Sequence, residues 1–282
     1  MRKNIQQWYC RTAPSLGNGF SGTPESAWGV LSYNPEIDLE KPTVFMGLYG
    51  FKDFYSLWQH KGIKEIFWCG SDITNFINGY WIDEIGEIRI NPQSLVKWIT
   101  RNCGNWVENK IEQQTLENLG ISSRVIPSFL GNVKDYKISY KWNKKPKVYT
   151  SVSGDNFQLY GWDKIEMLAQ NFPDIELHLY GNTKIYGSSK LNVIEHGRVP
   201  KEQMNKEIKM MQGALRLTEF DGASEIIVKA MLWGQYAFSF IPYEGVFNVD
   251  KLNLLLSLKE PNIKGRKWWL KNLNNFVWNN KK

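Results

Sequence analysis

The strongest constraint on the fold is an alternation of short apolar runs with longer helical patterns. In the first half, "TVFMGLYG" (43–50) predicts a buried strand, "FYSLWQHKG" (54–62) a helix that ends at a Gly, and "KEIFWCGSD" (64–72) the next strand. A helix predicted over 105–121 and a strand predicted over 123–130 continue the series. Strand, helix and strand in this order indicate a parallel sheet with helices on its faces.

The alternation lapses once and then restarts. Residues 131–147, "GNVKDYKISYKWNKKPK", are polar and basic without periodicity, which is typical of a connection between domains. After it, strands are predicted at 148–154, 175–182, 191–199, 213–220 and 236–242, and helices at 161–173, 200–211 and 223–234. We therefore expect an α/β protein built from two successive halves, each of which begins with a strand.

Composition narrows the class of protein. The three cysteines, Cys10, Cys69 and Cys103, form no C-x-x-C pair, so we expect reduced thiols in a cytoplasmic protein. No run of about 18 apolar residues occurs and the N-terminus has no apolar segment, so we expect neither a spanning helix nor a signal peptide. The 13 Trp and 13 Tyr are many, and burial in the core is their default role.

Polar residues follow four of the predicted strands, where each strand ends. They are Gly70–Asp72, Ser151–Asn156, Gly181–Asn182 and Thr218–Ser224, the last within "RLTEFDGASEIIVKAMLWGQY" (216–236). Ligands of open parallel sheets bind beyond the carboxyl ends of the strands, where helix N-termini attract anions. Any exit loop must also be polar to turn, so a loop with a helix cap is the alternative for each segment taken alone.

Much of the chain resembles a known family. The segments "EIFWCGSDI" (65–73), "WVENKIEQQTLENLGISSRVIPSFL" (106–130), "YGWDKIEMLAQNFPDIELHLYGN" (160–182) and "NVIEHGRVPKEQMNKEIKMMQGALRLTEFDGASEIIVKAMLWGQYAF" (192–238) are similar to GT-B glycosyltransferases of the retaining family 4 type. The resemblance implies two Rossmann-like domains that face each other across a cleft. We expect an acceptor-side domain at 1–138, a donor domain at 139–260, and a C-terminal helix, 261–282, that packs back on the first domain.

The resemblance also implies an activity. Such an enzyme transfers a sugar from a nucleotide-diphosphate donor to a glycan, lipid-linked or other hydroxyl acceptor, with retained stereochemistry. Family enzymes need no metal, and the sequence contains neither D-x-D nor H-E-x-x-H, so we expect no metal and no cofactor beyond the donor.

The donor site implied by the resemblance centres on the segment that follows residue 215. Asp221 would act at the donor sugar, and the N–H groups of Gly222, Ala223 and Ser224 would face the diphosphate. The family has a second Glu where this chain has Lys229 in "KAMLWG". Either Glu225 takes its role with Lys229 as an i,i+4 partner, or Lys229 contacts phosphate together with Arg216. Gly154, Tyr160, Gly181, Asn182 and Val199 complete the expected donor site.

The first half supplies the expected acceptor side. Asp72, at the exit of "FWCGSD", is the candidate catalytic residue there, and a capping Asp is its alternative role. Gly17 and Gly19 of the Gly-rich segment "YCRTAPSLGNGFSG" (9–22), together with Ser71, are expected near the acceptor. The three glycines of that segment fit no phosphate-loop spacing.

The C-terminal segment "KGRKWWLKNLNNFVWNNKK" (264–282) is basic and patterned as an amphipathic helix. Its predicted stripe consists of Trp269, Leu273 and Phe276, flanked by Leu270 and Val277. A basic helix with Trp is typical of membrane-interface binding, which would place the protein at the inner face of a membrane. Packing of the stripe against the fold is the other interpretation, and we favour it.

Three classes of function remain open. The first is a glycosyltransferase for a lipid-linked or surface glycan. The second, which the net charge of +7 allows, is a transferase that modifies nucleic acid. The third is a GT-B-like protein that binds a ligand without catalysis, which Lys229 in place of an acid makes credible.

Overall fold

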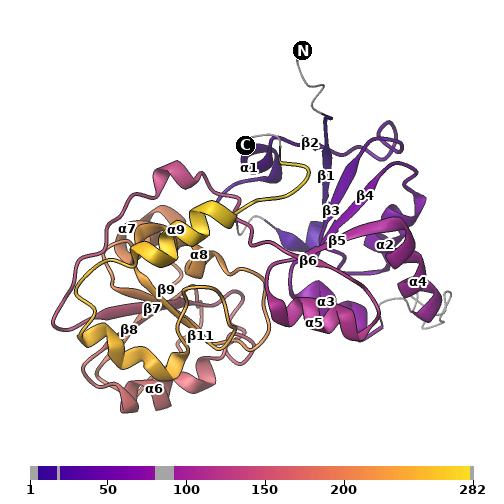
Figure 1. Ribbon diagram of the computed structural model, residues 1–282. Coiled ribbons are helices and arrows are strands. Elements are labelled where there is room, and N and C mark those ends of the chain that lie inside the picture. Colours follow the sequence, from indigo (N-terminus) through magenta and orange to yellow (C-terminus); the bar gives the residue numbers. More distant parts are fainter. Residues whose placement is uncertain (1–5, 18–19, 80–91, 280–282) are drawn as a thin grey trace. The chain divides into compact units, whose positions relative to one another are not determined.

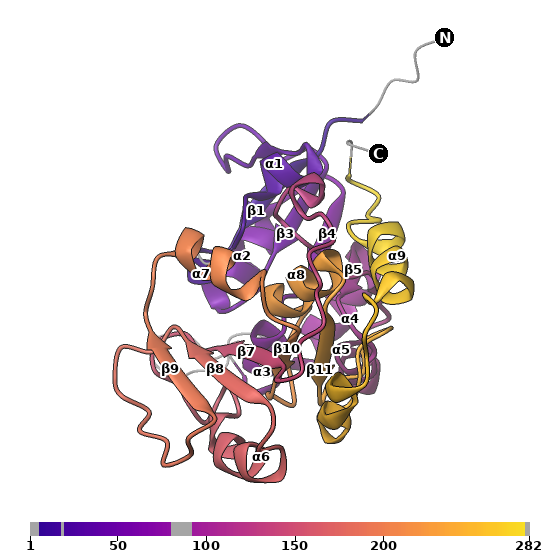
Figure 2. The same ribbon diagram turned by 90° about the vertical axis from the view of Figure 1, so that its left-hand side faces the viewer.

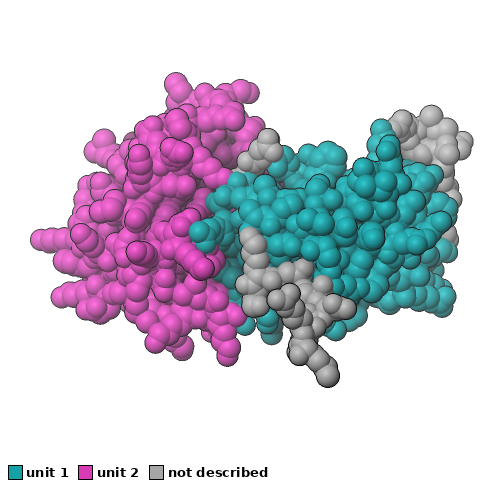
Figure 3. Space-filling model, turned by 90° about the horizontal axis from the view of Figure 1, so that it is seen from above, with its two compact units in different colours: residues 1–132, 220–223, 272–282 teal, residues 133–219, 224–271 magenta. Residues whose placement is uncertain are grey.

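The computed structural model describes residues 6–17, 20–79 and 92–279. The chain divides into two compact units, shown in different colours in Figure 3. Unit 1 contains the described residues of 1–132 together with 220–223 and 272–279, and unit 2 contains 133–219 and 224–271. Phe220–Ala223 is therefore part of unit 1, although the chain on both sides of it belongs to unit 2.

Unit 1 is a parallel sheet in the order β2-β1-β3-β4-β5-β6. Its strands are β1 (Tyr9–Thr12), β2 (Leu31–Ser32), β3 (Thr43–Met46), β4 (Lys64–Phe67), β5 (Cys103–Val107) and β6 (Arg124–Val125). Its helices are α1 (Pro24–Trp28), α2 (Phe51–Gln59), α3 (Ser71–Ile77), α4 (Pro92–Asn102) and α5 (Lys110–Asn118), with a 3-10 turn at Pro14–Leu16. The expected α/β architecture is confirmed (Figure 1).

Both faces of this sheet are buried, because side chains alternate along each strand. Phe45 and Ile66 point to the face covered by α2, α3, α4 and α5. Val44 and Phe67 point to the other face, where an aromatic cluster covers them. The aromatic members of that cluster are Trp8, Trp28, Phe67, Trp106, Phe276 and Trp278. Many of the aromatic residues are thus part of the core, and two of them, Phe276 and Trp278, come from the C-terminal segment.

Unit 2 is a parallel sheet in the order β11-β10-β7-β8-β9, whose labels appear side by side in Figure 2. Its strands are β7 (Lys147–Ser151), β8 (Glu176–Tyr180), β9 (Val193–Gly197), β10 (Gly213–Arg216) and β11 (Tyr236–Ser239). Its helices are α6 (Ile165–Asn171), α7 (Lys201–Ile208), α8 (Glu225–Trp233) and α9 (Ile263–Asn272). Short 3-10 helices lie at Val133–Asp135, Trp162–Lys164 and Val249–Leu256.

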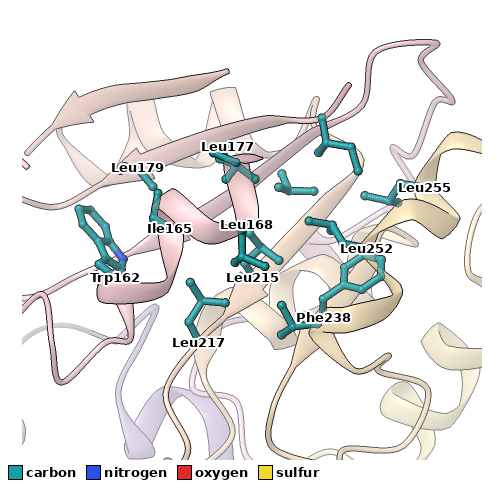
Figure 4. Packing of buried hydrophobic residues seen from close by; sticks show 14 of the residues in the cluster. Trp162, Ile165, Leu168, Leu177, Leu179, Leu215, Leu217, Phe238, Leu252 and Leu255 are labelled. Atoms are coloured by element: carbon teal, nitrogen blue, oxygen red, sulfur yellow. The ribbon is translucent and has the colours of Figure 1, made fainter. Parts of the chain in front are cut away.

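The alternation along β8 shows how this sheet is covered. Leu177 and Leu179 enter the hydrophobic cluster of Figure 4, which α6 and the 3-10 helix Val249–Leu256 complete. Tyr180, one position away, points to the opposite face, where its hydroxyl donates to Glu207 of α7 (2.7 Å). The sheet therefore lies between α6 on one side and α7 with α8 on the other (Figure 1).

The C-terminal segment differs from the helix expected over 261–282. α9 ends at Asn272, so Leu273 and Phe276 lie beyond it, although both are buried, as is Trp269. The indole N–H of Trp269 donates to Glu244 O (2.9 Å), and α9 belongs to unit 2, whereas the chain from Asn272 onward packs in unit 1. Asn274 has φ +55°, a left-handed conformation typical of residues just beyond a helix end, and each part buries its own aromatic residues.

Two further boundaries differ from the expected ranges. Residues 133–138 belong to unit 2, because the ring of Tyr136 packs on Trp233 with centroids 5.1 Å apart. The helix predicted over 105–121 is wrong in its first part, since 103–107 forms β5 and the helix begins only at Lys110. Asn109 separates them as a cap whose side chain accepts from the N–H groups of Ile111 and Glu112.

Among the described helices, none is both long and apolar enough to cross a membrane.

Candidate functional site

The segment Phe220–Ala223 is held against the carboxyl ends of β4 and β5 in unit 1. The side-chain amide of Asn109 donates to Asp221 O (2.6 Å), and the N–H of Ala223 donates to Glu108 Oε2 (2.8 Å). The fit requires glycine, since a Cβ on Gly222 would lie 2.1 Å from Glu108 Oε2. Gly70, with φ +86°, packs closely against the same segment. A Cβ added to Gly70 would lie only 2.8 Å from Gly222 N. The segment that carries the candidate Asp221 is therefore fixed by two hydrogen bonds and by close packing of Gly222 and Gly70.

Sequence reasoning missed the two acids beneath this segment. Glu108 Oε1 accepts from the N–H and hydroxyl of Ser128, at 3.0 and 2.5 Å. Glu112 is fully buried at the third position of α5, where its Oε2 accepts from the N–H groups of Glu108 (2.7 Å) and Asn109 (3.3 Å). Its Oε1 is buried and has no hydrogen-bond partner among the described residues. The signal was available, because Asn109-x-x-Glu112 is a capping box directly after an apolar run.

Burial dominates the electrostatics of this acidic pair. It raises the pKa of Glu108 to about 7 and that of Glu112 well above its ordinary value, and the mutual repulsion of the two carboxyls adds to the second shift. Two buried carboxylates this close do not both ionise readily. The pair therefore retains a proton near neutral pH, which the unpartnered Oε1 of Glu112 can carry.

Asp72, the expected catalytic residue of this half, lies buried at the second position of α3. It is 0% exposed, and its carboxylate accepts the N–H groups of Leu48 (3.0 Å), Cys69 (2.9 Å) and Ile73 (2.9 Å). These contacts join the loop after β3 to the start of α3. They fit the alternative of a residue that stabilises the helix start, because Asp72 accepts from the N–H of Ile73 in its first turn and from that of Cys69 just before it, while the N-cap position itself is Gly70.

The expected acceptor-side residues are only partly brought together. Ser71 begins α3 and is exposed beside Tyr49, whose hydroxyl donates to Cys69 O (3.5 Å). Tyr49 was not expected. Burial raises its pKa, and the charges of Asp72 and Asp221 act in the same direction. Gly17 ends the 3-10 turn with φ +57° and open space around it, and Gly19 lies outside the described residues.

In unit 2, Arg216 and Tyr160 come together at the carboxyl edge of the sheet. The guanidinium carbon of Arg216 lies 4.7 Å from the centre of the Tyr160 ring. The neighbouring acid Glu219 pairs with Lys164 (3.5 Å). Arg216 ends β10, and α8 begins nine positions later at Glu225. Ser224 is its N-cap residue, but the Ser224 side chain makes no capping hydrogen bond. A cation and an uncapped helix start therefore follow the same strand.

The loops that follow β7 and β8 are hydrogen-bonded to each other. Asp155, in the left-handed region at φ +56°, accepts from the N–H and hydroxyl of Thr183. Gly181 has φ +92°, and a Cβ on it would lie 2.2 Å from Val152 O, so only glycine fits.

Asn182 is buried. Its amide N–H2 donates to Lys184 O and Glu195, while its Oδ1 has no partner among the described residues. Gly154, at φ +64°, turns the loop after β7, and Val199 is half-buried after β9.

Lys229 is buried rather than exposed to a ligand. Only 5% of its surface is exposed, and its Nζ lies 3.3 Å from Glu225 Oε2 and donates to Asn205 Oδ1 (3.2 Å). Burial lowers the pKa of Lys229, and the carboxylate of Glu225 acts against that shift. Of the two roles considered for Lys229, these contacts are those of the i,i+4 partner of Glu225.

A polar cluster on the α7 face of unit 2 accounts for two of the histidines. His178 Nδ1 and His196 Nε2 lie 2.8 Å apart, and the His196 ring stacks on Tyr180 with centroids 4.2 Å apart. Burial, together with the neighbouring imidazole of His196, lowers the pKa of His178 to about 4. Both rings are therefore neutral near pH 7, which fits the structural role expected for His178. In the described parts of the chain, no group of three His, Cys, Asp or Glu side chains is arranged to hold a metal ion.

No family model matches the chain, and no curated protein matches it in sequence. In structure it is similar to sucrose-phosphate synthase from Thermosynechococcus elongatus, with a TM-score of 0.56 and 12% identity over 82% of this chain and 69% of that one. It is similar to α,α-trehalose 6-phosphate synthase from Burkholderia multivorans, with a TM-score of 0.56 and 11% identity over 88% and 70%.

A third similar structure is S. aureus TarM in complex with fondaparinux, α-GlcNAc-glycerol and UDP, with a TM-score of 0.50 and 14% identity over 82% of this chain. The chain covers 51% of TarM, about half of its length. These proteins are GT-B glycosyltransferases, and the chain has the GT-B fold. At these identities the likeness concerns the fold.

Proposed function

We propose that the chain is a glycosyltransferase that moves a sugar from a nucleotide-diphosphate donor to a hydroxyl of a glycan or lipid-linked acceptor. The observation that carries the proposal is a cation at the carboxyl edge of the unit 2 sheet: Arg216 stacks on Tyr160 at the end of β10, and the next helix of the chain, α8, has no side-chain cap at its start. A guanidinium and a helix N-terminus both stabilise negative charge, and phosphate oxygens match the planar donors of Arg. The GT-B fold supports the assignment.

Transfer needs charge stabilisation at the leaving group. As the bond between the anomeric carbon and the diphosphate breaks, negative charge grows on the diphosphate, and Arg216 with the first turn of α8 would stabilise it. The acceptor oxygen bonds to the anomeric carbon, and its proton passes to a diphosphate oxygen. In this proposal the reaction retains stereochemistry and needs neither a metal nor a protein nucleophile.

Two acids would bind the donor's hydroxyls. Asp221 is half-exposed in a segment that Glu108 and Asn109 hold in place. Its carboxylate would therefore accept from sugar hydroxyls with little loss of conformational entropy. Glu225 is 18% exposed and paired with Lys229, and it would accept from the ribose. The N–H of Ala223 is engaged by Glu108, so of the expected phosphate donors this one is already used.

Thermal shift with and without donors tests the proposal. The panel consists of nucleoside diphosphates and nucleotide-sugars, applied to the wild type, Arg216→Gln and the control Arg198→Gln, which removes the same charge from an exposed residue of unit 2. A ligand at 100 times its dissociation constant adds about 2.7 kcal/mol to the free energy of unfolding. We expect one nucleotide-sugar to stabilise the wild type and the control, and to bind Arg216→Gln roughly tenfold more weakly.

Turnover is the second measurement. With the donor identified, release of nucleoside diphosphate and a mass gain of one sugar on an acceptor would establish transfer. A donor that binds without any transfer to glycan or lipid-linked acceptors would point to the non-catalytic class, and a panel without any thermal shift would refute the proposal.

A further inference from the structure

Unit 1 contains a cavity of about 400 Å³ that neither the fold nor the proposed chemistry explains. It lies where β1 and β2 end, between α1 and α2, and is lined by Cys10, Arg11, Thr12, Pro14, Glu25, Ser32, Tyr33, Pro35 and Ser56. Small-ligand sites have volumes of roughly 300–1,000 Å³, so the cavity suits a compact ligand. All of its lining belongs to unit 1.

The lining carries one charge of each sign. The guanidinium of Arg11 pairs through Nη1 with Asp53, and no other hydrogen bond of its side chain is found in the described structure. Glu25 provides a carboxylate from the first turn of α1. Burial raises the pKa of the Cys10 thiol to about 12, so that group stays neutral. Because Asp53 already balances Arg11, the cavity has no surplus positive charge for a phosphate or carboxylate ligand.

The rest of the lining is suited to hydroxyl groups. Thr12, Ser32, Tyr33 and Ser56 are the hydroxyl-bearing residues of the lining. The hydroxyl of Ser56 already donates to Lys52 O (3.1 Å), so toward a ligand it would act as an acceptor. Pro14, Pro35 and the Tyr33 ring add apolar surface. The Tyr33 ring is held by its hydrogen bond to His60 Nδ1 (3.2 Å) and by edge contact with that imidazole. A sugar has the matching composition, with hydroxyls that donate to Glu25 and accept from Arg11, and C–H faces for the apolar walls.

The cavity is connected to the loop beside Asp221 through one carboxylate. Asp53 Oδ1 accepts from Arg11, and Asp53 Oδ2 accepts from the N–H groups of Tyr49 (2.8 Å) and Gly50 (3.1 Å). The hydroxyl of Tyr49 donates to Cys69 O (3.5 Å), and the next residue, Gly70, packs against Asp221 and Gly222. A ligand that contacts Arg11 would therefore be one side chain away from the loop that flanks the candidate transfer site.

We propose that this cavity binds a neutral sugar residue, and that it is a subsite for the acceptor glycan. The second part rests on the proposed function, and the first does not. The assignment narrows the acceptor to molecules that present an uncharged saccharide.

Ligand-observed NMR and calorimetry on the full chain, without any nucleotide, test the first part. The probes are methyl glycosides of glucose, galactose, mannose and N-acetylglucosamine, with inorganic phosphate and glycine as anionic and zwitterionic alternatives. The variants are Glu25→Gln and Tyr33→Phe, with Glu117→Gln, an exposed acid of α5, as the matched control. Circular dichroism shows that each variant is folded.

We expect at least one methyl glycoside to bind the wild type and Glu117→Gln alike. Loss of a charged acceptor weakens such a contact roughly tenfold or more, so Glu25→Gln should bind it at least tenfold more weakly. Absence of glycoside binding, equal binding by Glu25→Gln and the wild type, or binding of phosphate or glycine in place of a glycoside would each overturn the inference.

The same variants separate this inference from the proposed function. Glu25→Gln should keep the thermal shift caused by the nucleotide-sugar, and in a transfer assay it should raise the KM for the acceptor about tenfold while the KM for the donor stays unchanged. If the wild type binds a glycoside but no nucleotide or nucleotide-sugar, the proposed function fails and the sugar site stands.

Discussion

Replacing Glu112 by Gln should stabilise the protein at neutral pH, although the residue is fully buried. Its Oε2 accepts two backbone N–H groups and its Oε1 has no partner in the described structure. A Gln side chain keeps the accepting oxygen and places an amide at the position of Oε1, beside the carboxylate of Glu108. The change therefore preserves the cap of α5 and removes one of two buried acids that repel each other.

The sign of the effect follows from proton linkage. A carboxyl whose pKa is raised in the folded state is deprotonated first in the unfolded state, so stability is lost as the pH rises above the unfolded pKa. Each pH unit in that interval costs about 1.4 kcal/mol. For a group that shifts from 4.5 to about 7, as Glu108 does, the loss between pH 4.5 and 7 is about 3 kcal/mol. Glu112→Gln should recover about 1–3 kcal/mol at pH 7.5 and little at pH 5.

Urea unfolding followed by tryptophan fluorescence at pH 5, 6, 7 and 8 measures the difference between variant and wild type. Glu117→Gln is the control, since it changes an exposed acid on the same helix. The difference for Glu112→Gln should grow with pH, and that for Glu117→Gln should stay flat. A difference that is constant from pH 5 to 8, or a Glu112→Gln variant that is less stable at pH 8 than the wild type, would refute the reasoning.

Three other substitutions test separate parts of the structure. Because the pKa of His178 is lowered to about 4, acidification from pH 6.5 to 4 should lower the free energy of unfolding by roughly 1–3 kcal/mol. In urea titrations, His178→Gln should show a smaller loss over this pH range. Trp278→Ala should cost about 3–5 kcal/mol, because the indole is fully buried in unit 1, whereas Val277→Ala, half-exposed next to it, should stay within about 0.5 kcal/mol. Gly222→Ala should cost about 1–3 kcal/mol by breaking the contact to the carboxylate beneath it, and Gly50→Ala, with open space at its Cβ, should not.

The sequence was informative where a segment's own residues decide its structure. The strands at 43–50, 64–72 and 148–154 and the helix at 223–234 were found because their apolar pattern and glycine ends are local signals. The pattern failed at 105–121, where a strand and a helix follow each other with two residues between them and the apolar positions of both merge into one apparent period.

Contacts between distant parts of the chain could not be predicted. Glu108 and Ala223 are 115 positions apart, and no local sequence pattern near either residue indicates their hydrogen bond. The same holds for Asn274, whose side chain bonds to Phe129 on both N and O across 145 positions. These contacts decide that Phe220–Ala223 and the C-terminal segment belong to unit 1, so a domain boundary read along the sequence was bound to be incomplete.

Asp72 and Asp221 are two candidates at strand exits whose surroundings differ. Both follow a strand of a parallel sheet, yet one is fully buried among three backbone N–H donors and the other is half-exposed. Asp72→Asn turns an acceptor into a donor opposite the N–H of Leu48, so it should cost about 1–3 kcal/mol of stability. Below its unfolding temperature it should retain kcat, because the carboxylate is fully buried and bonded to backbone N–H groups.

Asp221→Asn should show the reverse, with a smaller loss of stability and a large loss of transfer, since an amide accepts on one oxygen only. Unfolding midpoints and kcat measured on both variants distinguish the two roles. If Asp72→Asn lost activity while remaining folded, or Asp221→Asn kept it, burial would be the wrong criterion for choosing between acids at strand exits.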